Sequence, residues 1–381
     1  MKLKRFTYHE FDSQPNRWLV PAFDVPDRCL LVGKNATGKS RLLNSMFGLS
    51  SLLNGHLLVS NLVSSNYAVA LEHDVSSDGS RGVTEYEFAI ESNKVVKEIL
   101  RVNGTERLVR ESSGVCRLFM EEVSRNVEFE VAKEELAARA KRDPRQHPFL
   151  EPLLTWASLA RIYRFNQVSL EQQGRMTVLG AQAPEGFDIT SDSPPAAAAF
   201  SRGLRRFGAK FTDAVKQDMA GLGYPIEDIS LTSIGMAPDG RPIEVVRVTE
   251  SDRHWFVDQM FISSGMFTAL WLLLNLELAV FSKAKIHVLI DDIGEGLDFD
   301  RSSALIKRVL EIAEENDLQL IATTNDRFVM NAVPLDYLNI LQRDASIVSV
   351  INRANSREIF ESFEKHGLSN FDLLARQMYR R

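Results

Sequence analysis

The segment Gly33-Lys-Asn-Ala-Thr-Gly38-Lys39-Ser40 constrains the fold of this 381-residue chain more than any other feature. It satisfies the pattern G-x-x-x-x-G-K-[ST], in which a tight loop turns its backbone N–H groups toward phosphate oxygens. The segment follows the apolar run Arg28–Val32 and precedes apolar residues that recur with helical spacing. The sequence therefore predicts an α/β fold in which a loop between a strand and a helix faces phosphate.

Each residue type in this loop suits the binding of a nucleotide. Glycine at positions 33 and 38 lets the backbone wrap closely, without side chains in the way. Lys39 is predicted to bind the β- and γ-phosphates of ATP, and the Ser40 hydroxyl is predicted to ligate Mg²⁺. A glycine-rich turn without a ligand is the alternative. The predicted nucleotide-binding residues here are Gly33, Lys34, Asn35, Ala36, Thr37, Gly38, Lys39, Ser40 and Arg41.

A second segment, Ile286-His-Val-Leu-Ile-Asp291-Asp292, is an apolar run that ends in two carboxylates. Such a run is typical of a buried parallel strand whose carboxyl end holds a metal ion. Asp291 is the predicted Mg²⁺ ligand. An acidic residue that caps a helix after the strand is the other interpretation.

Composition excludes several classes of protein. Hydrophobic residues make up 44% and charged residues 25%, which is ordinary for a globular chain. The net charge of −6 gives no general attraction to nucleic acid, and two cysteines far apart provide no disulfide framework. No export signal is recognisable, and Asn275 and Glu277 interrupt the apolar run 266–281, which favours a buried helix. We expect a soluble, cytoplasmic protein that does not enter membranes.

The remaining chain alternates between strand and helix patterns. Residues 67–130 are predicted to form an antiparallel meander, with strands at 67–72, 84–90, 95–102 and 127–131. A charged helix is expected at 134–142, and one long amphipathic helix is expected from Phe200 to Met219. Arg202, Arg206 and Lys210 follow each other at spacings of four and form a local basic patch, as does the segment 139–145. These patches could bind nucleic acid, although a solvated helix face is the commoner explanation.

Residues 291–298, D-D-I-G-E-G-L-D, resemble the D-E-P-T-x-x-L-D motif of ABC-type ATPases. The resemblance implies that Asp292 replaces the catalytic glutamate, with Glu295 as a substitute, and that Asp298 belongs to the D-loop. Residues 262–266, I-S-S-G-M, resemble the LSGGQ signature, so Ser263, Ser264 and Gly265 are expected to contact the nucleotide of a second subunit. Asn325 stands where the family has its switch histidine. Gln167 resembles the Q-loop glutamine that contacts nucleotide and metal, with Gln172 and Gln173 as rivals.

The spacing of these motifs points to one branch of that family. Lys39 and Ser263 are 224 positions apart, and this insertion resembles the SMC/RecF/OLD-like branch rather than transporter ATPases. More narrowly, the motifs resemble stand-alone AAA-type ATPases of bacterial defence and repair operons. The implied fold is a P-loop NTPase with an ABC-type head, which has a mixed or parallel central sheet, an antiparallel β-subdomain and a helical lobe. One ATPase domain is expected over residues 1–381, with the P-loop part at 1–66, the β-subdomain at 67–135, the helical lobe and insertion at 136–260, and the signature, Walker B, switch and C-terminal part at 261–381.

The resemblance also implies a function. ATP with Mg²⁺ is expected to bring two copies together as a homodimer, or as a larger homo-oligomer, and hydrolysis is expected to be slow. Because 55 residues follow Asp326, too few for a nuclease domain, a nuclease-like or toxin-like effector is expected on another chain. The alternative is a nucleotide-gated scaffold or sensor with little or no hydrolysis.

Overall fold

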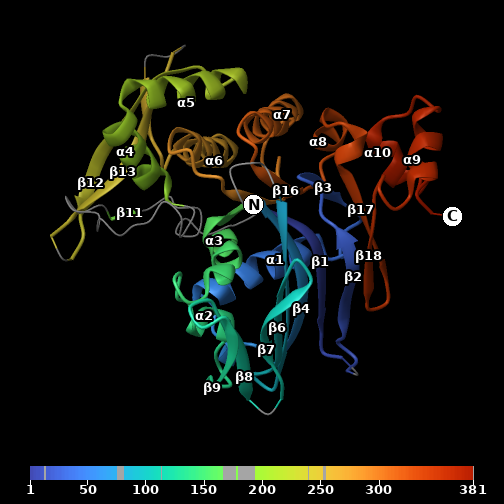
Figure 1. Cartoon of the computed structure of the whole chain (residues 1–381). Helices are drawn as coiled ribbons and strands as arrows, with labels where there is room; N and C mark the ends of the chain where they lie inside the picture. The colour runs from blue at the N-terminus through green and yellow to red at the C-terminus, as the bar shows by residue number, and fades with distance from the viewer. Residues whose placement is uncertain are drawn as a thin grey trace. The chain divides into compact units, whose positions relative to one another are not determined.

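The computed structural model describes the chain except for Ser13, residues 75–80, Ser113, residues 166–176, residues 179–193, Asp239, residues 252–254 and Arg381 (Figure 1). The chain divides into two compact units. Unit 1 comprises Met1–Ala160, Asp336–Gly367 and Gln377–Arg381, and unit 2 comprises Arg161–Leu335 and Leu368–Arg376. The four-part domain scheme predicted from the sequence stays a prediction.

The strands of unit 1 form a mixed sheet in the order β3-β17-β18-β2-β1-β4-β5-β6-β7-β8-β9. β17 runs parallel to β3, and β18 runs parallel to β2, whereas the neighbours from β2 through β1 and β4 to β9 are antiparallel. The strands are β1 (Lys2–Glu10), β2 (Trp18–Asp24), β3 (Arg28–Val32), β4 (Ser64–Asp74), β5 (Arg81–Glu91), β6 (Lys94–Val102), β7 (Thr105–Arg110), β8 (Val115–Met120), β9 (Arg125–Glu130), β17 (Leu338–Asp344) and β18 (Ile347–Ile351).

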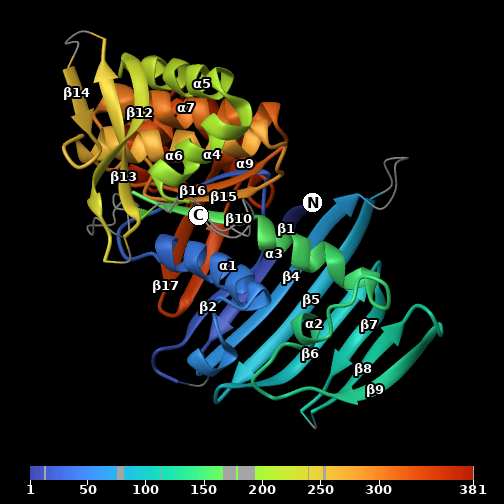
Figure 2. The same cartoon turned by 90° about the vertical axis from the view of Figure 1, so that its left-hand side faces the viewer.

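Helices cover one face of the antiparallel part of this sheet, as Figure 2 shows for α1 and α3. Ser50 Oγ and Asn54 Nδ2 of α1 both donate to the carbonyl of Ala157 in α3, at 2.6 and 2.8 Å, and so tie the two helices together. The helices of unit 1 are α1 (Lys39–Asn54), α2 (Ala137–Ala140), α3 (Glu151–Leu159) and α9 (Arg357–Glu364), with short 3-10 helices at η1 (Val59–Asn61) and η2 (Pro148–Leu150).

The meander has two strands more than the sequence pattern indicated. β7 and β8 lie between the predicted strands β6 and β9, and their alternate residues Leu108 and Leu118 are fully buried partners in the sheet. The helix expected at 134–142 is a single turn, α2. Two of its alanines donate their backbone N–H groups to a side chain from the sheet.

That side chain is Glu98 of β6, which is completely buried. Its carboxylate accepts hydrogen bonds from the backbone N–H groups of Ala137 and Ala138, at 2.7 and 2.8 Å, and from the Tyr86 hydroxyl at 2.8 Å. The buried guanidinium of Arg110 lies 3.8 Å from Glu98. Burial raises the pKa of Glu98, while these donors favour its ionised form.

Glu98→Ala is expected to destabilise the protein by about 3–5 kcal/mol, because it leaves a buried arginine without its carboxylate and two N–H groups without an acceptor. The matched control is Glu106→Ala, since Glu106 forms a half-exposed ion pair with Arg101, worth less than about 1 kcal/mol. Urea unfolding followed by tryptophan fluorescence measures both changes. Equal stabilities of the two variants would contradict this role of Glu98.

Unit 2 contains a short parallel sheet with β15 (His287–Asp291) between β10 (Ala160–Arg164) and β16 (Gln319–Thr323). β15 and β16 are parallel, and every residue of both strands is buried. The helices around them are α6 (Ser264–Phe281), α7 (Phe299–Glu315), α8 (Arg327–Ala332) and α10 (Asn370–Ala375), and η3 (Leu335–Tyr337) follows α8.

A helical lobe with its own antiparallel sheet completes unit 2 (Figure 2). β13 is the central strand of that sheet and pairs with β11, β12 and β14. The elements of the lobe are β11 (Thr177–Val178), α4 (Ala196–Phe207), α5 (Ala209–Gly221), β12 (Ile226–Met236), β13 (Pro242–Glu250) and β14 (Trp255–Asp258).

The single long helix predicted from Phe200 to Met219 is wrong, because Gly208 divides it into α4 and α5. Gly208 has φ 64° and ψ −147°, a conformation that interrupts a helix and that glycine adopts most readily. The two helices then fold against each other so closely that a Cβ on Gly203 would lie 2.2 Å from the Phe211 ring. The apolar spacing belongs to two helices instead: α4 buries Phe200 but exposes Leu204, and α5 buries Phe211.

Helix α6 forms the core of unit 2. Among the described residues it is the one helix long and apolar enough to cross a membrane, but 83% of it is buried inside the protein. Its polar Asn275 donates to the carbonyls of Pro194 and Trp271, at 3.1 and 2.9 Å, so burial leaves this amide satisfied. Its Glu277 is buried as well.

Candidate functional site

The loop after β3 adopts a conformation that needs its glycines. Ala36 and Gly38 have positive φ angles of 63° and 101°. A Cβ on Gly33 would lie 2.8 Å from both the Leu341 carbonyl oxygen and Thr37 Oγ1, so a side chain has no room there. The loop is therefore a tight backbone cradle at the N-terminus of the 16-residue helix α1.

Lys39 lies across this cradle. Its ammonium donates to the carbonyl of Gly33 at 2.9 Å and to that of Lys34 at 3.4 Å, and only 6% of the residue is exposed. Lys34 and Asn35 point their side chains to the exterior, whereas Ser40 is half-buried in the first turn of α1. A buried cation at a helix N-terminus is an arrangement that attracts anions.

Neighbouring side chains of unit 1 pack against the cradle. The Arg41 guanidinium lies 4.6 Å from the centre of the Trp18 ring and pairs with Glu10, while the Trp18 indole lies beneath Gly38. Trp18 is 1% exposed and packs on Tyr8, with ring centroids 5.6 Å apart. Trp18 and Tyr8 therefore belong to the core, and neither presents an open face for a purine base.

The carboxyl end of β15 in unit 2 positions the predicted metal ligand. Asp291 is 3% exposed, and its Oδ1 accepts a hydrogen bond from Thr323 Oγ1 at 2.7 Å. The Thr323 hydroxyl also accepts from the backbone N–H of Asp292 at 2.8 Å. Thr323 thus fixes both acidic residues from the neighbouring strand, a role that the sequence analysis missed, although a threonine at the end of a buried strand was visible.

Arg164, at the end of β10, contributes a positive charge to the same region. Burial lowers the pKa of Arg164, whereas the charge of Asp291 raises it. The backbone N–H of Phe165 donates to the Asp291 carbonyl at 3.0 Å, which holds β10 beside the acidic end of β15. The predicted Q-loop residue Gln167 and its rivals Gln172 and Gln173 lie outside the described residues.

Asp292 has an unusual backbone conformation, with φ 54°, in the left-handed region. Tight turns follow it, in which the N–H of Glu295 donates to the Asp292 carbonyl and the N–H of Leu297 donates to the Gly294 carbonyl, both at 3.1 Å. Glu295 is exposed, as is Asn325 after the end of β16. The structure thus places Asp292 directly after the buried Asp291, while Glu295 and Asn325 are exposed.

The predicted signature forms the N-terminus of α6. Ser263 is the N-cap residue, and its Oγ accepts from the N–H of Met266 at 3.4 Å. A Cβ on Gly265 would lie only 2.4 Å from the carbonyl oxygen of Gly296, so Gly265 packs directly on the turns that follow Asp292. Unit 2 therefore brings the signature into contact with the predicted D-loop.

Asp298 caps the N-terminus of α7. Its carboxylate accepts from the N–H of Arg301 at 3.0 Å and from the Arg301 guanidinium at 2.6 Å. The backbone N–H of Arg301 lowers the pKa of Asp298. A cavity of about 430 Å³ opens beside Ser263, and its wall includes Tyr224 and Arg301, whose guanidinium lies 4.3 Å from the Tyr224 ring centre.

The residues present suit a magnesium nucleotide. The cradle offers backbone N–H groups and a lysine, where a side chain at Gly33 would fill the space. Within unit 1, Ser40 offers a hydroxyl, a hard oxygen ligand of the kind Mg²⁺ prefers. Within unit 2, taken by itself, Asp291 offers a carboxylate that Thr323 orients, which is a ligand of the same kind. Among the described residues, no group of three or more histidine, cysteine or acidic side chains is placed to hold a metal ion.

Comparison with solved structures shows which fold this is. The SMC head bound to the C-winged helix domain of ScpA matches with a TM-score of 0.50 and 13% identity, over 92% of this chain and 97% of that one. The Smc head domain with an extended coiled coil, bound to the C-terminal domain of ScpA and derived from Pyrococcus furiosus, matches with a TM-score of 0.52 and 13% identity, over 95% and 99%. No family model and no curated protein sequence matches. The predicted fold class is confirmed: the chain has the α/β fold of an ABC-type P-loop head, with a large mixed sheet and a smaller antiparallel sheet.

Proposed function

We propose that this protein binds ATP with Mg²⁺ and hydrolyses it slowly, and that ATP joins two copies into a dimer that controls a partner effector. The observation that carries the proposal is the cradle at residues 33–40, with the Lys39 ammonium 2.9 Å from the Gly33 carbonyl. On binding, Lys39 would exchange its loop carbonyls for the β- and γ-phosphates, which are stronger, charged acceptors.

The remaining predicted residues have separate tasks. Ser40 and Asp291 would hold Mg²⁺, which supplies charge neutralisation at the phosphates. Asp292 would orient the attacking water and accept its proton. The N-terminus of α6, with Ser263, Ser264 and Gly265, would face the γ-phosphate on a second copy, where its free N–H groups stabilise negative charge. Loss of the γ-phosphate removes that stabilisation, so hydrolysis would release the dimer.

A specific observation favours a second candidate, a nucleotide-gated scaffold with little or no hydrolysis. Asp292 is one methylene shorter than the glutamate of ABC-type ATPases, and its left-handed backbone orients it differently from a residue in a regular strand. The exposed amide of Asn325 can form a hydrogen bond but cannot carry the charge of an imidazole. Both features predict slow turnover.

The biological setting belongs to the same proposal. The motifs resemble those of ATPases in anti-phage defence and DNA repair operons, so the effector would be a nuclease-like or toxin-like protein on another chain, in the cytoplasm. A direct role for nucleic acid has less support. Gly208 separates the basic residues Arg202 and Arg206 on α4 from Lys210 on α5, so they do not form one continuous helical stripe.

ATP-dependent association is the direct test of this proposal. The sedimentation coefficient measured with Mg²⁺ and ATP is expected to indicate a dimer, and the coefficient measured with ADP a monomer. Replacing Ser263 by arginine is expected to abolish the dimer without weakening nucleotide binding, because Ser263 would act on the partner's nucleotide. A sedimentation coefficient that is independent of nucleotide, in a protein that binds ATP, would rule out the dimer switch.

A further inference from the structure

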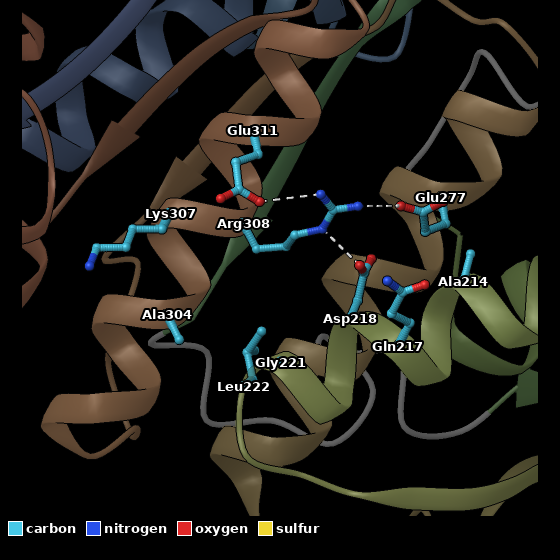
Figure 3. A pocket seen from close by; sticks show the side chains of 10 residues that line it. All are labelled: Ala214, Gln217, Asp218, Gly221, Leu222, Glu277, Ala304, Lys307, Arg308 and Glu311. Carbon is cyan, nitrogen blue, oxygen red and sulfur yellow. Dashed lines mark hydrogen bonds and ion pairs between the residues drawn. The ribbon is translucent and has the colours of Figure 1, made fainter.

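Three helices of unit 2 line an open pocket of about 500 Å³, whose wall carries a cluster of charged side chains outside the candidate nucleotide site (Figure 3). Asp218 comes from α5, Glu277 from α6 and Arg308 from α7. The Arg308 guanidinium donates through Nε to Asp218 at 2.7 Å, and its Nη2 lies 3.6 Å from Glu277. One cation is thus shared by two carboxyl groups on two other helices.

The two carboxyl groups are removed from water. The side chains of Asp218 and Glu277 are 5% and 6% exposed, and Asp218 Oδ2 is buried without a hydrogen-bond partner among the described residues. Asp218 also lies in the last turn of α5, where the helix dipole disfavours a negative charge. Two buried carboxylates beside a single guanidinium carry one uncompensated negative charge, which a shared proton removes.

The surrounding charges favour that proton. Burial, reinforced by the neighbouring Asp218, raises the pKa of Glu277 to about 7, and Arg308 only partly opposes this. Burial likewise raises the pKa of Asp218. From α7, the charge of Glu315 raises the pKa of Glu277, as the charge of Asp218 does. Glu311, also on α7, lies 3.3 Å from Arg308, and its charge raises the pKa of Asp218. Lys307 also lines the pocket but points away from the cluster (Figure 3).

We propose that Asp218, Glu277 and Arg308 form a proton-operated latch that fastens α5 of the helical lobe to the signature helix α6. With one proton in the pair, a carboxyl group donates to a carboxylate and the cluster is neutral. Without it, two carboxylates repel each other across the contact between α5 and α6. The latch therefore holds most firmly in acid solution and loosens progressively as the pH rises from the ordinary range of a carboxyl group through about 7.

The latch lies close in the chain to the predicted signature and would restrain it. β14 of the lobe ends at Asp258, and the chain enters α6 at Ser264, so the signature lies on the short connection between the lobe and the helix. Fastening the lobe to α6 restrains both ends of that connection. This consequence rests on the proposed function, whereas the latch itself is a property of the folded chain.

Hydrogen exchange of the full-length protein without nucleotide tests the latch independently of ATP. Because the pKa of Glu277 differs between latched and open forms, the protection factors of α5, corrected for intrinsic exchange, are expected to fall about tenfold between pH 6 and pH 8. Glu277→Gln keeps the shape of the protonated side chain and cannot titrate, so α5 should keep its pH 6 protection at pH 8. Asp218→Asn should also remove the pH dependence, since its amide can donate to Glu277.

The matched control is Glu311→Gln, on the exposed side of the same arginine. Of the charges that act on Asp218, that of Glu311 has the smallest effect, so this variant should retain most of the wild-type response to pH. Protection of wild-type α5 that is equal at the two pH values would overturn the latch, as would a Glu277→Gln variant that still loses protection at pH 8. A protein that shows the latch but binds no ATP would instead overturn the proposed function and leave the latch standing.

Discussion

Lys39→Ala is expected to weaken ATP binding by about 100-fold, whereas Lys34→Ala in the same loop leaves it within about threefold. Lys39 lies buried across the cradle and would form charge-assisted hydrogen bonds to phosphate, which are worth about 1.5–3 kcal/mol each. Lys34 has the same charge, but its side chain is exposed to solvent, so it controls for the loss of one positive charge from the loop. Equilibrium dialysis with Mg²⁺ and ATP measures both affinities.

A stability control accompanies this comparison, because Lys39 also donates to two loop carbonyls. Thermal unfolding without nucleotide shows whether Lys39→Ala retains the fold. If both variants are folded and bind ATP equally well, Lys39 does not contact phosphate, and the cradle is a structural turn. Equal weakening of both variants would mean that only the general charge of the loop attracts the nucleotide.

The second large effect concerns Asp292. Asp292→Asn is expected to lower the rate of ATP hydrolysis by about 100-fold at saturating ATP, because an amide cannot accept the proton of the attacking water. Binding of ATP should be nearly unchanged, since Asp291 and Lys39 remain. Glu295→Gln is the matched control, because Glu295 follows three residues later in the same turns and is exposed. Steady-state phosphate release measures the rates.

The outcomes separate the candidate mechanisms. Loss of activity in Glu295→Gln, with activity retained in Asp292→Asn, would assign the base to Glu295. A wild-type protein that binds ATP and releases no phosphate above the background of Lys39→Ala would favour the nucleotide-gated scaffold over the slow ATPase. Fast turnover of the isolated wild-type protein would contradict the slow hydrolysis predicted from Asp292 and Asn325.

The sequence predicted the strands and the loop of the candidate site better than the side chains that hold them in place. The tight loop at residues 33–40 could be located because its pattern of glycines is typical of a turn between a buried strand and a helix. β15 was equally clear, since a buried parallel strand is apolar throughout. The role of Thr323 was missed because it depends on the register of β15 against β16. The sequence of either strand alone does not determine that register.

Elements stabilised by distant contacts were the hardest to predict. β7 and β8 are short and carry charged residues on their exposed faces, so their strand pattern is weak without the neighbours that bury Leu108 and Leu118. The single turn α2 is held by Glu98, about 40 residues earlier in the chain. The apolar residues keep their helical spacing across Gly208, because α4 and α5 each bury an apolar face. Periodicity alone therefore does not reveal the bend between the two helices.

The contact between Gly265 and Gly296 restricts which residues the predicted signature can carry. The carbonyl oxygen of Gly296 occupies the volume that any side chain at position 265 would need. No such obstacle accounts for a glycine at position 264, where this chain has serine. Packing within a single copy therefore limits substitution unequally along these residues: position 265 requires glycine even before contacts with a nucleotide or a second subunit are considered.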